Sequence, residues 1–201
     1  MPWIFGPAFS GHPKPVELAE LRKFDVFTRA RAFEARTKAF FIEQVDVLQT
    51  PQLWAPFPLA VMTCIGIEMI GSYKYGDAQG DRNDHFKKLA KDMNSRFGEI
   101  RPTPDGAMKE LAYFLYNGFR NSLAHGFYGK WVFVTHQKEK AATFRYSSQK
   151  RFVVVNVYWF YQRFKEVEEE YLKNLLSATN LTLDPLKTFN ETFEKNFAIW
   201  I

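Results

Sequence analysis

Cysteine and histidine are scarce in this chain, and their scarcity limits the chemistry that the protein can support. The 201 residues include one cysteine, Cys64, and four histidines. A single cysteine excludes an intramolecular disulfide, and its place in an apolar run predicts a buried thiol. His12, His85, His125 and His136 are scattered without the short spacing of zinc ligands. We therefore expect no metal and no other cofactor.

The chain also lacks a long apolar run. Its N-terminus does not have the basic region and apolar stretch of a secretory signal. The most apolar segment, residues 57–70, is shorter than the ~20 residues that a membrane helix needs, begins beside Pro56 and Pro58, and contains Glu68. We expect this segment to be a buried helix of a cytoplasmic protein that does not contact a membrane.

Aromatic and basic residues, by contrast, are abundant. The chain has 21 Phe, 46% hydrophobic residues and 24% charged residues, which predict a globular protein with an aromatic-rich core or a large buried oligomer surface. The formal net charge of +5 and a pI of about 9.2 favour a polyanionic partner.

Hydrophobic periodicity predicts a mainly α fold. Residues 1–15, with four prolines and two glycines, are expected to form an irregular N-terminal arm, and residues 16–201 one helical domain. The expected helices are 16–48, 58–73, 85–97, one that opens at Pro104, 158–176 and 185–198. In the helix 158–176 the inward residues are expected to be Phe160, Phe164, Val167, Tyr171 and Leu175. Segments rich in β-branched and aromatic residues predict strands at 131–135, 142–146 and 151–155, which we assign to a small antiparallel β-ribbon within 129–155.

The helix that opens at Pro104 ends in the segment Arg120-Asn121-Ser122-Leu123-Ala124-His125-Gly126. A guanidinium can hold a phosphate through two hydrogen bonds, and an imidazole can transfer a proton near neutral pH. Together they supply two parts of a site that cleaves phosphodiesters. On a regular α-helix, residues five apart lie about 140° apart around the axis. For Arg120 and His125 to act on the same phosphate, the last turn of the helix must be loosened, the long arginine must reach around the helix, or a second subunit must supply one of the two groups.

This segment resembles the Arg-(four to six residues)-His signature of the HEPN superfamily, in the variant with Asn directly after the Arg. The resemblance implies a helical bundle, with the ribbon inserted after the motif-bearing helix. It also implies a metal-independent endoribonuclease of a toxin–antitoxin, phage-defence or RNA-processing system. HEPN ribonucleases typically form homodimers in which the motifs of two subunits face one another. His125 would be the general acid or base, Arg120 would bind the phosphate, and Asn121 would orient the histidine or bond a phosphate oxygen. The implied partners are RNA, a second copy of the chain and an antitoxin protein.

Two further features fit such a site. Glu68, the one charge in its apolar helix, is a candidate to orient Arg120 or His125, and a buried salt bridge with an arginine explains it equally well. Residues 130–151 hold six basic residues and one acid, so their local charge of +5 equals that of the whole chain. These side chains either hold RNA or protect a ribbon edge from aggregation. The candidate RNA-binding residues are Lys130, Lys138, Lys140, Arg145, Tyr146, Lys150 and Arg151.

Two other functions remain compatible with the motif. A non-catalytic HEPN-like module would bind RNA, a nucleotide or another protein without cleaving anything. Alternatively, arginine and histidine near the C-terminus of a helix stabilise the helix through its dipole, and the motif would then be purely structural.

Overall fold

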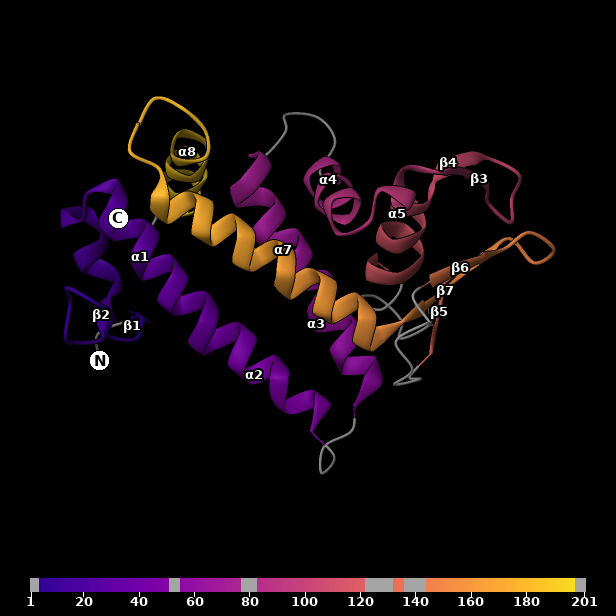
Figure 1. Cartoon of the computed structure of the whole chain (residues 1–201), viewed down its shortest axis with the longest axis horizontal. Coiled ribbons are helices and arrows are strands. Elements are labelled where there is room, and N and C mark those ends of the chain that lie inside the picture. The colour runs from indigo at the N-terminus through magenta and orange to yellow at the C-terminus, as the bar shows by residue number, and fades with distance from the viewer. Residues whose placement is uncertain (1–3, 51–54, 77–82, 122–131, 136–143, 198–201) are drawn as a thin grey trace.

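The computed structural model describes residues 4–50, 55–76, 83–121, 132–135 and 144–197, and describes residues 118–121 and 134 by their backbone alone. The molecule is elongated, with helices along most of its length and a small sheet at the end far from both termini (Figure 1). The prediction of a mainly α fold is confirmed.

The N-terminal arm contains a short pair of strands. β1 (Ile4–Gly6) pairs antiparallel with β2 (Val16–Glu17), and Phe5 is buried. η1 (Leu18–Lys23), a 3-10 helix, follows. The predicted helix over 16–48 is therefore wrong at residues 16–17 and 24–25, and over residues 18–23 it is a 3-10 helix rather than part of the long helix.

The first long helix begins only after Asp25, whose Oδ1 accepts a hydrogen bond of 2.8 Å from the backbone N–H of Thr28. Such a cap satisfies a backbone donor that the first turn leaves without a partner and so fixes the helix start. From there one continuous rod consists of α1 (Val26–Thr37), the π-helical η2 (Lys38–Ile42), α2 (Glu43–Asp46) and the 3-10 helix η3 (Val47–Gln49).

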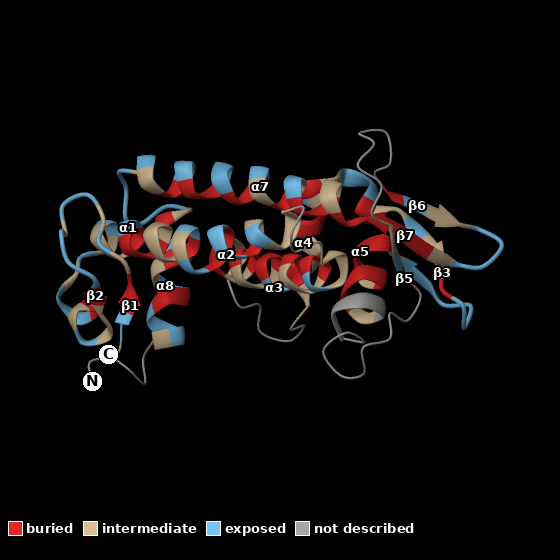
Figure 2. Cartoon of the chain, turned by 90° about the horizontal axis from the view of Figure 1, so that it is seen from below, coloured by how far each residue is buried: buried red, intermediate tan, exposed pale blue. Residues whose placement is uncertain are grey.

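The central helix is α3 (Pro56–Tyr75), which contacts α4, α7 and α8. Gly66 permits this close packing, since a Cβ there would lie 2.6 Å from the ring of Phe164. Cys64 is buried, as predicted. The helix has 20 residues and is thus longer than the predicted segment, so by length and composition alone it could cross a membrane. Half of its most apolar window is buried inside the structure, and we interpret α3 as a core helix (Figure 2).

The chain between α3 and the motif is less helical than predicted. α4 (Asp84–Met93) ends four residues before the predicted end, and a 3-10 helix, η4 (Ser95–Gly98), follows. The helix predicted to open at Pro104 is instead preceded by an antiparallel hairpin, β3 (Ile100–Pro102) with β4 (Met108–Glu110). Its turn closes through a 2.8 Å hydrogen bond from Thr103 N–H to the carbonyl of Ala107, with Gly106 at φ 89°. The motif-bearing helix starts only at α5 (Leu111–Tyr113) and continues as the π-helical η5 (Phe114–Asn121).

The sheet is mixed rather than wholly antiparallel. Its strands are β5 (Val132–Thr135), β6 (Phe144–Ser147) and β7 (Phe152–Asn156), in the order β5-β7-β6. β6 pairs antiparallel with β7, as predicted, but β5 pairs parallel with β7. β7 is the central strand, and its run Val153-Val154-Val155 is buried, which is typical of a strand covered on both faces.

Two helices complete the fold, and both match their predicted ranges within a residue or two. α7 (Val157–Ser177) contacts α1, α3 and α4, and all five residues predicted to face inward are buried. α8 (Leu186–Phe197) packs against α1 and α3. Aromatic rings form much of this part of the core. The ring centroid of Phe189 lies 5.5 Å from that of Phe33 and 5.5 Å from that of Phe193.

Candidate functional site

The backbone of the motif-bearing helix is described as far as Asn121. Arg120 and Asn121 lie in the last residues of η5. His125 lies outside the described residues, as do the side chains of Arg120 and Asn121. The structure therefore places the start of the motif and does not test the geometry between the arginine and the histidine.

The base of this helix is fixed by buried aromatic contacts. The ring of Phe114 meets Tyr146 of β6 edge-on at 5.9 Å, and Tyr116 meets Phe86 of α4 at 5.2 Å. Leu111 and Leu115 are fully buried. The helix that carries Arg120 is thus anchored between α4 and the sheet.

The winding of η5 differs from that of an ordinary helix. Its residues are π-helical, a form with hydrogen bonds between residues five apart that is rare and is frequent at functional sites. This winding brings residues five apart onto nearly the same face, whereas an α-helix separates them by about 140°. The helix predicted here is therefore π-helical rather than α-helical over residues 114–121, and residues 122–125 lie outside the described part of the chain.

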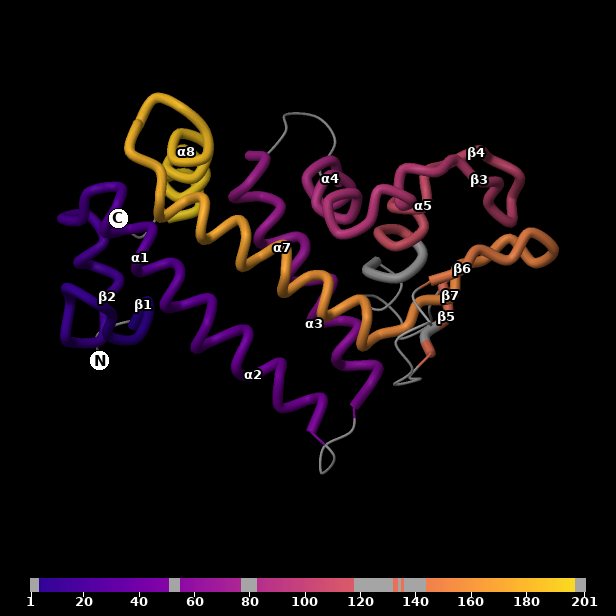
Figure 3. The backbone as a smooth tube through the Cα atoms, viewed as in Figure 1, coloured from indigo at the N-terminus to yellow at the C-terminus, as the bar shows by residue number. Residues whose placement is uncertain are grey.

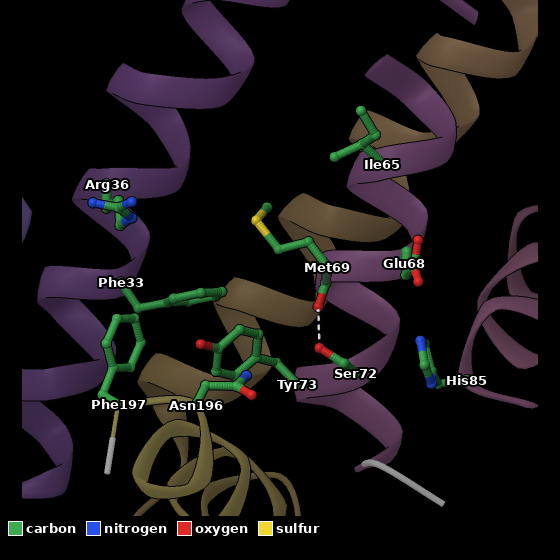
Figure 4. Close-up of a pocket in the computed structure, with 10 residues that line it drawn as sticks. All are labelled: Phe33, Arg36, Ile65, Glu68, Met69, Ser72, Tyr73, His85, Asn196 and Phe197. Carbon is green, nitrogen blue, oxygen red and sulfur yellow. Dashed lines mark hydrogen bonds between the residues drawn. The ribbon is translucent and has the colours of Figure 1, made fainter. Parts of the chain in front are cut away.

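Glu68 lies elsewhere, at the wall of a cavity of about 510 Å³ (Figure 4). It is half-buried rather than enclosed in the core as predicted. Figure 4 shows its carboxylate on the same side of α3 as His85 of α4, while Met69 and Tyr73 point toward α1. The described lining comes from α1, α3, α4 and α8: Phe33, Arg36, Ile65, Glu68, Met69, Ser72, Tyr73, His85, Asn196 and Phe197. Whether Glu68 orients a motif residue stays a prediction.

His85 approaches α3 because Gly71 leaves room for it. A Cβ at position 71 would lie 2.8 Å from the backbone oxygen of His85, so α4 starts in contact with α3. On the far wall of the cavity, the guanidinium of Arg36 lies 4.9 Å from the ring centroid of Phe5 and donates to the Phe5 carbonyl. Burial lowers the pKa of Arg36. Arg36 therefore ties the N-terminal arm to α1.

Four of the seven predicted RNA-binding residues are described: Arg145 and Tyr146 belong to β6, and Lys150 and Arg151 to the turn between β6 and β7. Arg145, Lys150 and Arg151 are exposed. Tyr146 is only half-exposed, because it contacts Phe114 and its hydroxyl donates a 2.6 Å hydrogen bond to the carbonyl of Pro102. Lys130, Lys138 and Lys140 lie outside the described residues.

Two arginines that the sequence did not indicate join this group. Arg96 of η4 and Arg101 of β3 line a cavity together with Arg145 and Tyr146. Figure 3 shows the β3–β4 hairpin and β6 approaching one another at the end of the molecule far from the termini. The sequence analysis placed Arg96 in the helix predicted over 85–97, whereas the structure places it in the 3-10 helix η4, next to the hairpin that carries Arg101.

Among the described residues there is no group of three or more His, Cys, Asp or Glu side chains placed to hold a metal ion. Comparison of the chain with protein-family models, with curated protein sequences and with solved structures gave no match in any of the three.

Proposed function

We propose that this protein is a metal-independent endoribonuclease of the HEPN type. The observation that carries the proposal is the Arg120-Asn121-x-x-x-His125 segment at the end of a buried, π-helical element of a mainly helical chain. The described arrangement supports it in a second respect: Arg145, an exposed cation of β6, directly precedes Tyr146, whose ring contacts Phe114 at the base of that element.

The proposed reaction uses the 2′-hydroxyl of RNA as the nucleophile, so no metal-bound water is needed. Catalysis then requires removal of the 2′ proton, protonation of the leaving 5′ oxygen and stabilisation of charge on the phosphate. His125 would transfer a proton, since an unperturbed histidine has a pKa of ~6.5. Arg120 would hold the phosphate through two hydrogen bonds, and Asn121 would orient the histidine or the phosphate. The products are a 2′,3′-cyclic phosphate and a 5′-hydroxyl.

One histidine cannot act as base and acid in the same step, so the proposed active form is a homodimer. The motifs of two subunits would face each other, and one His125 would accept the proton while the other donates one. The proposed setting is a cytoplasmic toxin or phage-defence effector, with an antitoxin protein as a further partner.

Cleavage of a mixed RNA pool in EDTA tests the proposal. We expect native protein to yield cyclic-phosphate ends and His125→Ala to lose at least about a hundredfold in rate, the usual scale of general acid–base catalysis. Arg120→Ala should lose a similar factor.

His12→Ala is the matched control, because His12 lies in the N-terminal arm and bonds the carbonyl of Lys14. Equal cleavage by native and His125→Ala protein would refute the proposal. RNA binding by both forms with no cleavage by either would identify the alternative, a non-catalytic RNA-binding module.

A further inference from the structure

The surface between the β3–β4 hairpin and β6 forms a cleft of about 490 Å³, which we call the arginine cleft. It carries three arginines and one carboxylate, a formal charge of +2. The residues used below are Arg96, Glu99, Arg101, Phe144, Arg145 and Tyr146.

Two of the arginines lie over aromatic rings. The guanidinium carbon of Arg96 is 5.0 Å from the ring centroid of Phe144, and that of Arg101 is 6.0 Å from the centroid of Tyr146. Phe144 is itself stacked on Phe97 at 4.5 Å. Cation–π contacts and the fixed rings beneath them restrict where both guanidiniums can lie.

One carboxylate holds the pair together. Glu99 accepts a 2.8 Å hydrogen bond from Arg96 Nε and a 2.5 Å hydrogen bond from Arg101 Nη2. The Arg96 hydrogen bond is the main cause that lowers the pKa of Glu99, so the carboxylate is charged at neutral pH. A guanidinium has five N–H donors. The side chains of Arg96 and Arg101 are 54% and 43% exposed, and the hydrogen bonds to Glu99 engage one nitrogen of each guanidinium.

We propose that the arginine cleft binds the phosphodiester backbone of single-stranded RNA and leads it to the motif-bearing helix. Preplaced guanidiniums bind phosphate oxygens through pairs of hydrogen bonds, and their planes also stack against unpaired bases. The cleft lies beside the motif-bearing helix, because Tyr146, which lines the cleft, also contacts Phe114, the first residue of η5. The choice of RNA as the ligand rests on the proposed function, whereas the phosphate chemistry comes from the cleft itself.

The test measures binding of a labelled single-stranded RNA of about 12 nucleotides, a length within the usual site sizes of such proteins. Fluorescence anisotropy is recorded over a series of salt concentrations in the His125→Ala background, so that the RNA stays intact. The double variant Arg96→Ala/Arg101→Ala should bind at least about tenfold more weakly. The slope of log affinity against log salt should fall by about 1.4, since each lost phosphate contact to a single strand contributes about 0.7.

Two further variants make the test specific. Arg22→Ala/Arg31→Ala removes the same charge from exposed positions at the opposite end of the molecule and should leave affinity and slope unchanged. Glu99→Gln removes the negative charge that competes with phosphate and keeps an amide oxygen that can still accept a hydrogen bond from an arginine, so binding should tighten. A merely structural role of the arginines predicts no such gain.

Unchanged RNA affinity in the Arg96→Ala/Arg101→Ala protein overturns the inference, as does a parent protein that binds no RNA. If the double variant fails to fold, as judged by circular dichroism, Glu99→Gln decides: unchanged or weaker binding refutes the cleft. Failure of the proposed function is a separate result, since it appears as absent or His125-independent cleavage, and binding by the cleft is still measurable.

Discussion

Glu168 makes the stability of this protein depend on pH in a predictable direction. The residue lies on the inner face of α7, is 1% exposed, and its Oε1 has no hydrogen-bond partner among the described residues. Burial, with a smaller contribution from the neighbouring charge of Glu169, raises the pKa of Glu168 from 4.5 to about 7. The favourable charges of Lys38 and Lys165 do not offset the loss of water around the carboxylate.

The sign follows from proton linkage. Below pH 4.5 the carboxyl is protonated in both states, so its ionisation costs the fold nothing. Between pH 4.5 and about 7 the unfolded chain releases this proton while the folded protein retains it, so stability falls as pH rises. Above pH 7 the folded protein must hold a buried carboxylate. Since one unit of pKa corresponds to about 1.4 kcal/mol, the loss amounts to as much as about 3 kcal/mol.

Glu168→Gln removes this ionisation while keeping the shape of the side chain. Urea unfolding at about pH 4.5 and about pH 8.5 gives the free energy of unfolding at each end of the window. We expect similar stabilities for native and variant protein at the lower pH and a variant that is more stable by up to about 3 kcal/mol at the higher pH. Glu170→Gln, an exposed position on the same helix, is the control and should follow the native curve.

Parallel pH curves for native protein and Glu168→Gln would refute the reasoning, because they would mean that the carboxyl has the same pKa in both states. A Glu168→Gln variant less stable than native at high pH would contradict it more strongly, since it would show that the charged form is favoured inside the fold.

Two further predictions concern the helical core. Gly66→Ala should lower the free energy of unfolding by about 1–3 kcal/mol, because the new Cβ would lie 2.6 Å from the ring of Phe164. Thermal melting measures the loss. Gly98→Ala is the control, because a Cβ at position 98 meets only the flexible side chain of Lys91, at 3.4 Å. Equal losses in the two variants would refute the predicted clash. Asp25→Ala should lower the free energy of unfolding by about 1 kcal/mol, because it removes the acceptor of the Thr28 N–H, and Asp25→Asn should retain most of that stability. An Asp25→Ala variant as stable as native protein in urea unfolding would show that the cap does not fix the helix start.

The helices that the sequence predicted well are those whose packing follows from local periodicity. α7 shows this most clearly: its inward positions recur every three or four residues, and Asn156 caps its start. The segment around Pro104 was misassigned because Thr-Pro-Asp-Gly suits both a helix start and a tight turn. Pairing of the flanking strands decides between them, and that pairing is not local.

The same reason limits what could be predicted of the site. The basic character of Arg145 and its neighbours is visible in the sequence, but the order of the strands depends on which strands pair with β7, and that pairing is not local. Arg96 and Arg101 become part of a cleft only because the hairpin folds toward β6. Glu68 was expected inside the core because its helix is apolar on most sides, yet α3 leaves one stretch of its surface open to a cavity.

The direct junction of β7 with α7 has a mechanical consequence. No loop separates them, and the side chain of Asn156 accepts hydrogen bonds from the backbone N–H groups of Tyr158 and Trp159 at the first turn. The sheet therefore cannot tilt without breaking this cap or moving a helix of 21 residues, about 30 Å long. The sheet that forms one wall of the arginine cleft is therefore held by α7. Because α7 also packs against α1 and α3, the position of the cleft is coupled to helices near the termini.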